Sequence, residues 1–170
     1  MDIYTQLAYD TIKMFLIEEN LPDLKKVNPE LLSKKAGCFV TLRDKNDQLR
    51  GCIGTIKPLY KNLAGEIEAN AVAASTQDPR FSPVTIEELD NLKVSVDVLN
   101  DPEQIFSNDD LDLKKYGIIV QAEDGRDGLL LPNIKGINSV EEQVIIAREK
   151  AGIEKDEQIS LFRFTVDRHE

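Results

Sequence analysis

Two short segments combine reactive or charged side chains with residues that restrict the backbone. In the first, Leu49–Thr55, Cys52 lies between Gly51 and Gly54, and Arg50 precedes them. Two glycines in a strand typically mark a bulge or a close approach of the backbone to another group. Free amides at a bulge, together with a guanidinium, can bind an anion, and a nearby Arg lowers the pKa of a thiol. Cys52 is therefore a candidate nucleophile, and the alternative is a small buried thiol without reactivity.

The second segment is Asp78-Pro79-Arg80-Phe81. Pro79 keeps Asp78 out of the helical conformation, and the Asp side chain can bond to the local backbone in an Asx-turn. We expect a stiff loop that presents Arg80, with Asp78 orienting the guanidinium and Phe81 anchoring the loop in the core. In the alternative, Arg80 bonds to the last carbonyls of the preceding helix.

Other chemistries are poorly supported by the residue types. The only His, His169, is next to the C-terminus, where chains usually fray, so a Ser-His-Asp or Cys-His nucleophile is disfavoured. Two cysteines cannot form a four-thiolate zinc site or a disulfide framework, and no dinucleotide fingerprint occurs. We therefore expect no metal and no intrinsic cofactor.

Charge and hydropathy limit the class of partner. The net charge is −10, and the whole excess lies after Phe81, whereas Ser33–Lys61 carries seven basic and only two acidic residues. This basic region indicates either solvated strand edges or a small anion site, because an acidic chain with few aromatics is a poor nucleic-acid binder. No apolar run is long enough for a membrane helix and no signal peptide is apparent, so we expect a cytoplasmic protein.

Several elements position these segments in the first half of the chain. Apolar spacing predicts a helix over Asp2–Asn20, and Pro29 begins a short second helix. Gly37–Leu42 and Leu49–Ile56 are predicted to form a hairpin, and Leu59–Thr76 a long helix.

The second half alternates in the same way. Capping boxes begin helices at Thr85 and at Ser139, the latter ending at Gly152. Strands are predicted over Lys93–Leu99, Gly117–Ala122, Leu129–Leu131 and Ile159–Val166, with a turn at Asp124–Gly128. About six strands and four or five helices in mixed order indicate an α+β fold with mostly antiparallel sheet and flanking helices.

The relation between the two cysteines depends on the hairpin register. If Cys38 pairs directly with Cys52, the two thiols share a sheet face, and a shift of one residue places them on opposite faces. The turn at Asp44–Asp47 leaves both registers open.

The two segments, taken together and in order, resemble the AMME chromosomal-region protein family. The resemblance covers nearly the whole chain, and its details are similar to the bacterial branch of the family. The run Leu-Arg-Gly-Cys-Ile-Gly is its most specific part. The motif positions fall on Arg50, Gly51, Cys52, Ile53, Gly54, Thr55, Asp78, Pro79, Arg80 and Phe81.

This resemblance implies one AMME-region domain over residues 1–170, with a larger and a smaller subdomain. It also implies partners, because the bacterial domain occurs beside or fused to a Memo-like protein and a radical-SAM protein, in AmmeMemoRadiSam-type systems. Cys38 stands where the family usually has Val or another small apolar residue, so the resemblance predicts a substitution in the core.

Three hypotheses follow. In the first, Cys52 is the nucleophile of a small anion site in which Arg50 and Arg80 hold a carboxylate or phosphate. In the second, the chain is a non-catalytic adaptor that docks on those partners through an exposed patch around Ile53 and Phe81. In the third, Gly51–Gly54 clamps RNA as in KH modules, although its Cys-Ile interior is not basic.

Overall fold

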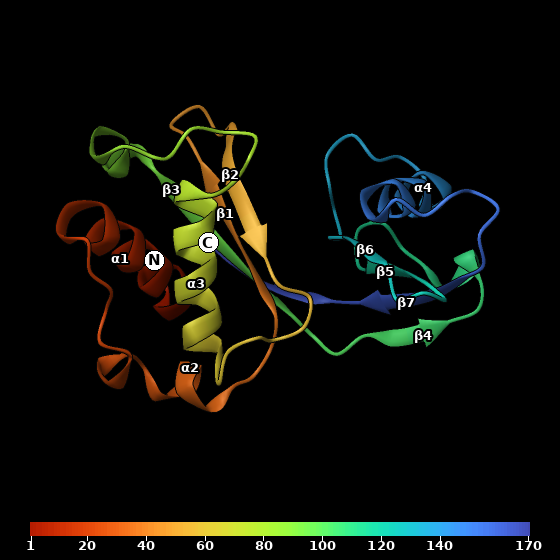
Figure 1. The fold of residues 1–170 in the computed structure, drawn as a ribbon, viewed down its shortest axis with the longest axis horizontal. Helices are drawn as coiled ribbons and strands as arrows, with labels where there is room; N and C mark the ends of the chain where they lie inside the picture. Colours follow the sequence, from red (N-terminus) through yellow and green to blue (C-terminus); the bar gives the residue numbers. More distant parts are fainter. The chain divides into compact units, whose positions relative to one another are not determined.

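The computed structural model describes residues 1–170 and forms two compact units, Met1–Val98 with Asp167–Glu170, and Leu99–Val166 (Figure 1). The helices are α1 (Ile3–Glu18), α2 (Pro29–Ser33), α3 (Leu63–Thr76) and α4 (Val140–Ala151), with 3₁₀ turns η1 (Leu24–Lys26), η2 (Ile86–Asn91) and η3 (Asn108–Asp110). The strands are β1 (Cys38–Arg43), β2 (Leu49–Gly54), β3 (Lys93–Leu99), β4 (Glu103–Ile105), β5 (Gly117–Ala122), β6 (Asp127–Leu130), β7 (Ile159–Phe164) and β8 (Val166–His169). The predicted α+β class is confirmed.

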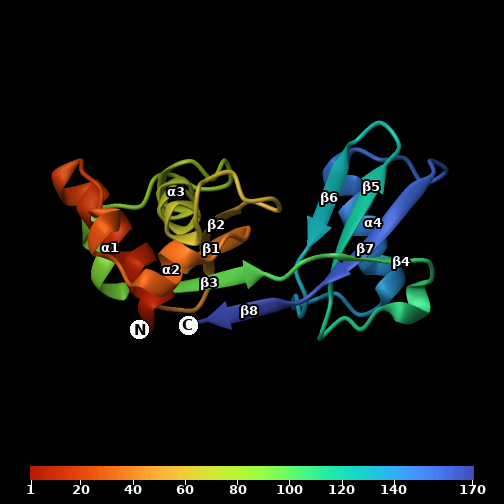
Figure 2. The same ribbon diagram turned by 90° about the horizontal axis from the view of Figure 1, so that it is seen from below.

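The larger unit is built on a sheet in the order β2-β1-β3-β8 (Figure 2). Strand β1 pairs antiparallel with both β2 and β3, and residues of β1 alternate between buried and partly exposed along the strand. Cys38, Val40 and Leu42 face the helices and are fully buried, while Thr41 lies on the other face. This alternation is the period-2 pattern of a strand with one face in a core.

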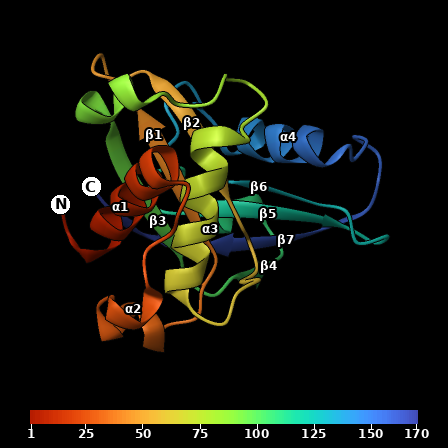
Figure 3. The same cartoon turned by 60° about the vertical axis from the view of Figure 1, so that its left-hand side comes forward.

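Helices α1 and α3 lie side by side over the buried face of this sheet (Figure 3). Asp2 caps α1 with bonds from the N–H groups of Tyr4 and Thr5, and Asn62 caps α3 with a bond from the Gly65 N–H. The core that they enclose is aliphatic and includes Ile12, Leu31, Leu63 and Ile67 among its fully buried side chains.

The smaller unit has its own antiparallel sheet, in the order β4-β7-β5-β6, with α4 packed on β5 and β6. Ser139 caps the N-terminus of α4, and Gly152 ends the helix in the left-handed conformation, at φ 63°. Both ends of α4 therefore lie where the capping signals predict them.

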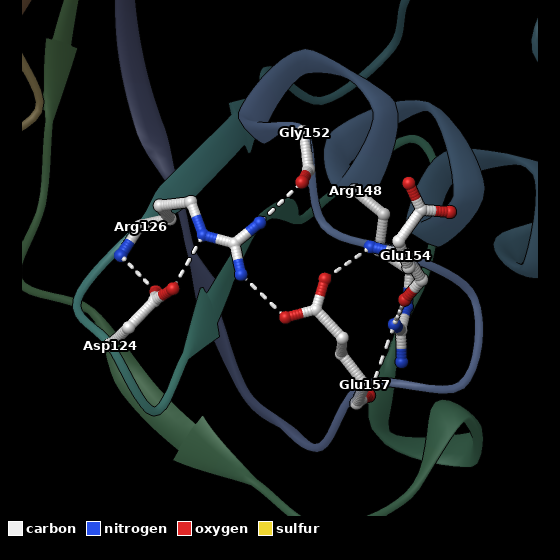
Figure 4. Close-up of polar contacts among 6 residues, drawn as sticks. All are labelled: Asp124, Arg126, Arg148, Gly152, Glu154 and Glu157. Atoms are coloured by element: carbon white, nitrogen blue, oxygen red, sulfur yellow. Dashed lines mark hydrogen bonds and ion pairs between the residues drawn. The ribbon is translucent and has the colours of Figure 1, made fainter.

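An arginine network joins the β5–β6 turn to the loop after α4 (Figure 4). Arg126 bonds to Asp124 and Glu157 and donates to the Gly152 carbonyl, so one guanidinium ties the turn to the helix end. Arg148 donates to the carbonyl of Glu157. Because these groups bond to one another within the smaller unit, we assign the network a structural role.

Three elements differ from the prediction. Helix α3 begins at Leu63 rather than Leu59, because Asn62 caps it and the preceding backbone N–H groups bond to the carboxylate of Glu66. The predicted strand Ile159–Val166 is two strands, β7 and β8, separated at Thr165, which bonds to Asn100 outside either ladder. The short strand β4 has too few residues for its alternation to be recognised.

Candidate functional site

Cys52 lies on the face of the larger sheet opposite the helices. Its pairing partner on β1 is Thr41, so neither predicted register forms, and Cys38 faces the helix side. Cys38 is three residues from Thr41, so the two thiols lie on opposite faces of the sheet, as expected for any shift from direct pairing by an odd number of residues. The Cys52 Sγ shares a hydrogen bond of 3.2 Å with the Thr41 hydroxyl.

Asp78 connects Cys52 to the second motif. Its Oδ2 accepts from the backbone N–H of Cys52 at 2.9 Å, and its Oδ1 accepts from the backbone N–H of Arg80 at 3.1 Å. The second bond is the predicted Asx-turn. The Arg80 guanidinium also bonds to both carboxylate oxygens, at 3.0 and 2.7 Å. These bonds from Arg80, followed by the one from the Cys52 backbone, hold the pKa of Asp78 well below its usual range.

Arg80 is oriented by Asp78 and still open to solvent. Its side chain is 54% exposed, and its Nη2 also reaches the Cys52 carbonyl at 3.4 Å. Nη1 has no protein acceptor, so one edge of the guanidinium is free to bind an anion. The Arg80 side chain makes no bond to the end of α3, which excludes the alternative helix-stop role.

Sequence reasoning missed a second arginine on the Cys52 face of the sheet. Arg168 on β8 bonds to Asp97 on β3, from Nε to Oδ1 at 2.7 Å and from Nη2 to Oδ2 at 2.9 Å. Asp97 is fully buried, and Arg168 bonds to it through Nε and Nη2, which leaves Nη1 without a protein acceptor. The bond to Asp97 is the main cause that raises the pKa of Arg168, and Cys52 is close enough to contribute. The sheet order provides the juxtaposition, for which the sequence carries no local signal.

The expected lowering of the Cys52 pKa is wrong, because the shift has the opposite direction. Burial raises the pKa of Cys52 above its ordinary value, although the Thr41 hydrogen bond and the charge of Arg80 act to lower it. Asp78 and Asp97 also raise this pKa because their carboxylates lie near the sulfur. The resting side chain is therefore a protonated thiol at neutral pH.

Arg50 has internal partners on every nitrogen. It bonds to both carboxylate oxygens of Glu88, at 2.6 and 3.0 Å, and donates to the carbonyls of Ser82 and Pro83. Glu88 in turn accepts from the Thr85 N–H, which completes the predicted capping signal. Arg50 thus fastens β2 to η2 and the loop before it.

The motif glycines make close contacts inside the protein. A Cβ on Gly51 would lie 2.2 Å from the carbonyl oxygen of Ala74, and a Cβ on Gly54 would lie 2.3 Å from the Phe39 ring. Both glycines lie within β2, so the pair forms no loop of the KH type. The close approach predicted from the glycines is to α3 and to a neighbouring side chain.

Thr55 leads to a buried acid that sequence reasoning missed. Its hydroxyl donates to Glu66 at 2.6 Å, and Glu66 is fully buried in α3. The same carboxylate accepts from the backbone N–H groups of Leu59 and Tyr60. A carboxyl in the first turn of a helix was the available signal, and its three donors identify a structural role for Thr55.

Two further expectations need correction. Phe81 is only half-buried and lies beneath Arg80, 5.4 Å from the guanidinium to the ring centre, and Val84 is the residue of this loop that reaches the core. His169 is ordered at the end of β8, where it bonds to Asp2 at 2.5 Å and stacks on the Tyr4 ring.

No group of three or more His, Cys, Asp or Glu side chains is arranged to hold a metal ion. None of the helices has the length and apolar character needed to span a membrane.

Comparison with known proteins identifies the family. The AMMECR1 family profile matches residues 5–169. The chain belongs to the AMMECR1 family. A protein of Thermotoga maritima is 52% identical over 149 residues, which cover 87% of this chain and 84% of that protein.

Two other relatives extend the comparison. A protein of Clostridium acetobutylicum is 45% identical and matches 99% of this chain, which spans 36% of that longer protein. The crystal structure of the uncharacterized protein PH0010 from Pyrococcus horikoshii is similar with a TM-score of 0.86 and 33% identity, covering 97% of this chain and 88% of the other. The resemblance to the AMME-region family is confirmed over the two motifs and over the fold.

Proposed function

We propose that this AMMECR1-family protein binds a small anion beside the Cys52 thiol, as a cytoplasmic component of a Memo-like and radical-SAM system in which residues 1–170 act as one domain. The observation that carries the proposal is a pair of guanidiniums on the Cys52 face of the larger sheet, each held by a buried carboxylate and each with an unused Nη1 edge. An Arg that is held on one side by a carboxylate loses less freedom when it binds an anion on the other.

The arrangement assigns different roles to the motif residues. Arg80 and Arg168 bind the anion, and Asp78 and Asp97 position them. Arg50, Gly51, Gly54 and Thr55 hold β2 against the rest of the unit. Because Cys52 is a protonated thiol at rest, it contacts a bound ligand as a weak S–H donor, and nucleophilic attack requires loss of that proton.

The adaptor alternative is less well supported. It expects an exposed apolar patch around Ile53 and Phe81, but Ile53 packs against the helix core and Phe81 lies under Arg80. The partners themselves rest on the family resemblance. Retention of both partners by purified wild-type protein, and their loss in Arg80→Gln, would extend the role of this face to docking.

Alkylation kinetics test the anion site. The ratio of the rates with iodoacetate, an anion, and iodoacetamide, its neutral analogue, is measured at Cys52 by mass spectrometry and compared with the ratio for free cysteine. We expect the ratio to exceed that of free cysteine about tenfold, because roughly 1.4 kcal/mol of attraction to two guanidiniums favours the anionic reagent. Inorganic phosphate should slow the iodoacetate reaction selectively.

Matched variants separate the site from general charge. Arg80→Gln and Arg168→Gln should each reduce the ratio several-fold, whereas Arg43→Gln should leave it unchanged, because Arg43 lies at the exposed end of β1 and bonds to the Asp47 carbonyl. A ratio equal to that of free cysteine, or an equal effect of all three variants, would refute the anion site. Cys52→Ser and Cys52→Ala then test whether phosphate binding itself needs the side chain.

A further inference from the structure

The loop of residues 56–62 joins β2 to α3 (Figure 1) and exposes two large apolar side chains. Leu59 is 76% exposed, more than any other large apolar side chain of the larger unit, and Tyr60 beside it is 47% exposed. Lys57 and Lys61 flank this pair, and both lysines are exposed. Single exposed apolar residues are common, whereas an adjacent pair flanked by lysines suits contact with a surface that is both apolar and anionic.

A buried acid holds the 56–62 loop in place. The carboxylate of Glu66, which is fully buried in α3, accepts from the backbone N–H groups of Leu59 and Tyr60. The Tyr60 side chain also packs on Gly65, where an added Cβ would lie 3.0 Å from the Tyr60 Cβ. Because the backbone of the loop is bonded inward, the loop already has a fixed shape and loses little freedom when it binds.

Four lysines gather at this end of the larger sheet. Strands β1 and β2 are antiparallel, so the start of β1 lies beside the end of β2. The chain before β1 stays close to the 56–62 loop, because a Cβ on Gly37 would lie 2.4 Å from the Ile56 carbonyl oxygen. The Leu63 N–H at the start of α3 donates to the Lys34 carbonyl at 2.8 Å. The lysine cluster consists of Lys34, Lys35, Lys57 and Lys61.

Most of the charge of the lysine cluster is unpaired. Of the four lysines only Lys34 forms an ion pair, with Asp167 at 3.6 Å. The net charge of the chain is −10, but exposed charges more than about 10 Å apart are largely screened at about 0.1 M salt. Acidic groups elsewhere on the chain therefore oppose the lysine cluster only in part. The loop combines a fixed apolar tip with a positive surround.

We propose that the 56–62 loop docks the protein on an anionic membrane surface without crossing the membrane. Leu59 and Tyr60 enter the boundary between headgroups and acyl chains, where Tyr is favoured, and the lysines face the headgroups. Two apolar side chains are too few for a standard protein interface of about 800 Å² per partner. A fluid bilayer needs no matching shape and surrounds a small tip with negative charge.

Vesicle sedimentation with the full chain tests the docking. Sucrose-loaded vesicles contain phosphatidylcholine alone or with about 30% phosphatidylserine. We expect a dissociation constant of about 1 mM lipid for the anionic vesicles and binding at least about tenfold weaker for phosphatidylcholine. Raising the salt from about 0.1 M to about 1 M should remove the difference, because it shortens the range of the attraction.

Matched variants assign the contact to the loop. Lys57→Gln and Lys61→Gln should each weaken binding about fivefold, and Leu59→Asn about tenfold. Lys45→Gln removes the same charge at the other end of the β1–β2 hairpin and should change nothing. Ile86→Asn, which removes an exposed apolar side chain from η2, should also have no effect.

A Leu59→Trp variant reports directly on the tip, since the chain has no other Trp. Its emission should shift to the blue on anionic vesicles and be quenched by lipids with brominated acyl chains. Arg80→Gln should leave vesicle binding unchanged, because this inference is independent of the anion site at Cys52.

Four results would overturn the proposal. Equal binding to both vesicle types, or none with about 10 mM lipid, would exclude an anionic membrane and leave a protein as the partner of the loop. An equal effect of Lys45→Gln and Lys57→Gln would mean that general charge is responsible. Binding of Leu59→Trp without quenching would show that the tip stays in water. Loss of binding in Arg80→Gln would assign the lipid contact to the Cys52 face.

Discussion

Replacing Gly51 by Ala tests whether the central glycine of the motif is kept for packing. The added Cβ would lie 2.2 Å from the Ala74 carbonyl oxygen, whereas ordinary contacts begin at 3.4 Å, so α3 and β2 must separate by about 1.2 Å locally. Overpacking against backbone costs about 1–3 kcal/mol. The lower entropy of the unfolded chain returns about 0.4–1 kcal/mol. Because the clash at 2.2 Å is with backbone rather than with a flexible side chain, the cost lies near the upper end, about 3 kcal/mol, and we expect a net loss of about 2 kcal/mol in the free energy of unfolding.

Urea unfolding followed by far-UV circular dichroism measures this loss, since the chain has no Trp. With an m-value of about 2 kcal/mol/M, the midpoint should fall by about 1 M while m stays constant. The matched control is Gly65→Ala, the same added methyl in α3, where the nearest atom is the Cβ of the half-exposed Tyr60 side chain at 3.0 Å.

That control should cost less stability than Gly51→Ala, because its shortest contact is 3.0 Å rather than 2.2 Å and Ala is the better helix former. If Gly51→Ala is as stable as the wild type, the close approach to Ala74 does not constrain this position. The glycine would then have to be explained by a ligand.

Three further predictions concern buried acids and the thiols. Asp78→Asn should cost about 2 kcal/mol at pH 7 in urea unfolding, because the buried carboxylate holds both Cys52 and the largely exposed Arg80. Folding lowers the pKa of Asp78, so its contribution to the free energy of unfolding is present above the unfolded pKa of about 3.9 and is lost as the pH falls further. The stability difference between Asp78→Asn and the wild type should therefore shrink below about pH 4. A difference that stays constant with pH would contradict this. Glu66→Gln should cost about 2 kcal/mol by removing a charged acceptor from three donors, and a loss as small as that of a surface substitution would contradict its structural role. Burial raises the pKa of Cys38 to about 12 and that of Cys52 above its ordinary value. At pH 7, iodoacetamide should therefore modify Cys52 more slowly than free cysteine and Cys38 only after unfolding. Fast modification of Cys52 would refute a protonated resting thiol.

The sequence predicted part of the candidate site. The Asx-turn at Asp78 and the orientation of Arg80 follow from residues two positions apart, and both form as expected. The direction of the pKa shift at Cys52 could not be predicted, because it depends on burial and on two carboxylates whose positions come from other elements. Arg50 is a residue type that binds anions, but its guanidinium already bonds to the carboxylate of Glu88.

The sequence by itself determined the features that arise from contacts a few residues apart. The α+β class, the helix starts at Asp2, Asn28 and Ser139, and the helix end at Gly152 follow from caps and hydrophobic periodicity. These signals are reliable because a cap bonds to backbone groups within one helical turn.

The tertiary structure alone decided which side chains meet at the sheet face. Arg168 and Asp97 are 71 residues apart in the chain, and they pair because β8 lies next to β3 in the sheet. The register that places Thr41 opposite Cys52 determines which face the thiol occupies, and a shift of one residue would reverse it. Hydrogen bonds and charge interactions depend on distance in space, so sequence separation carries no signal for these partners.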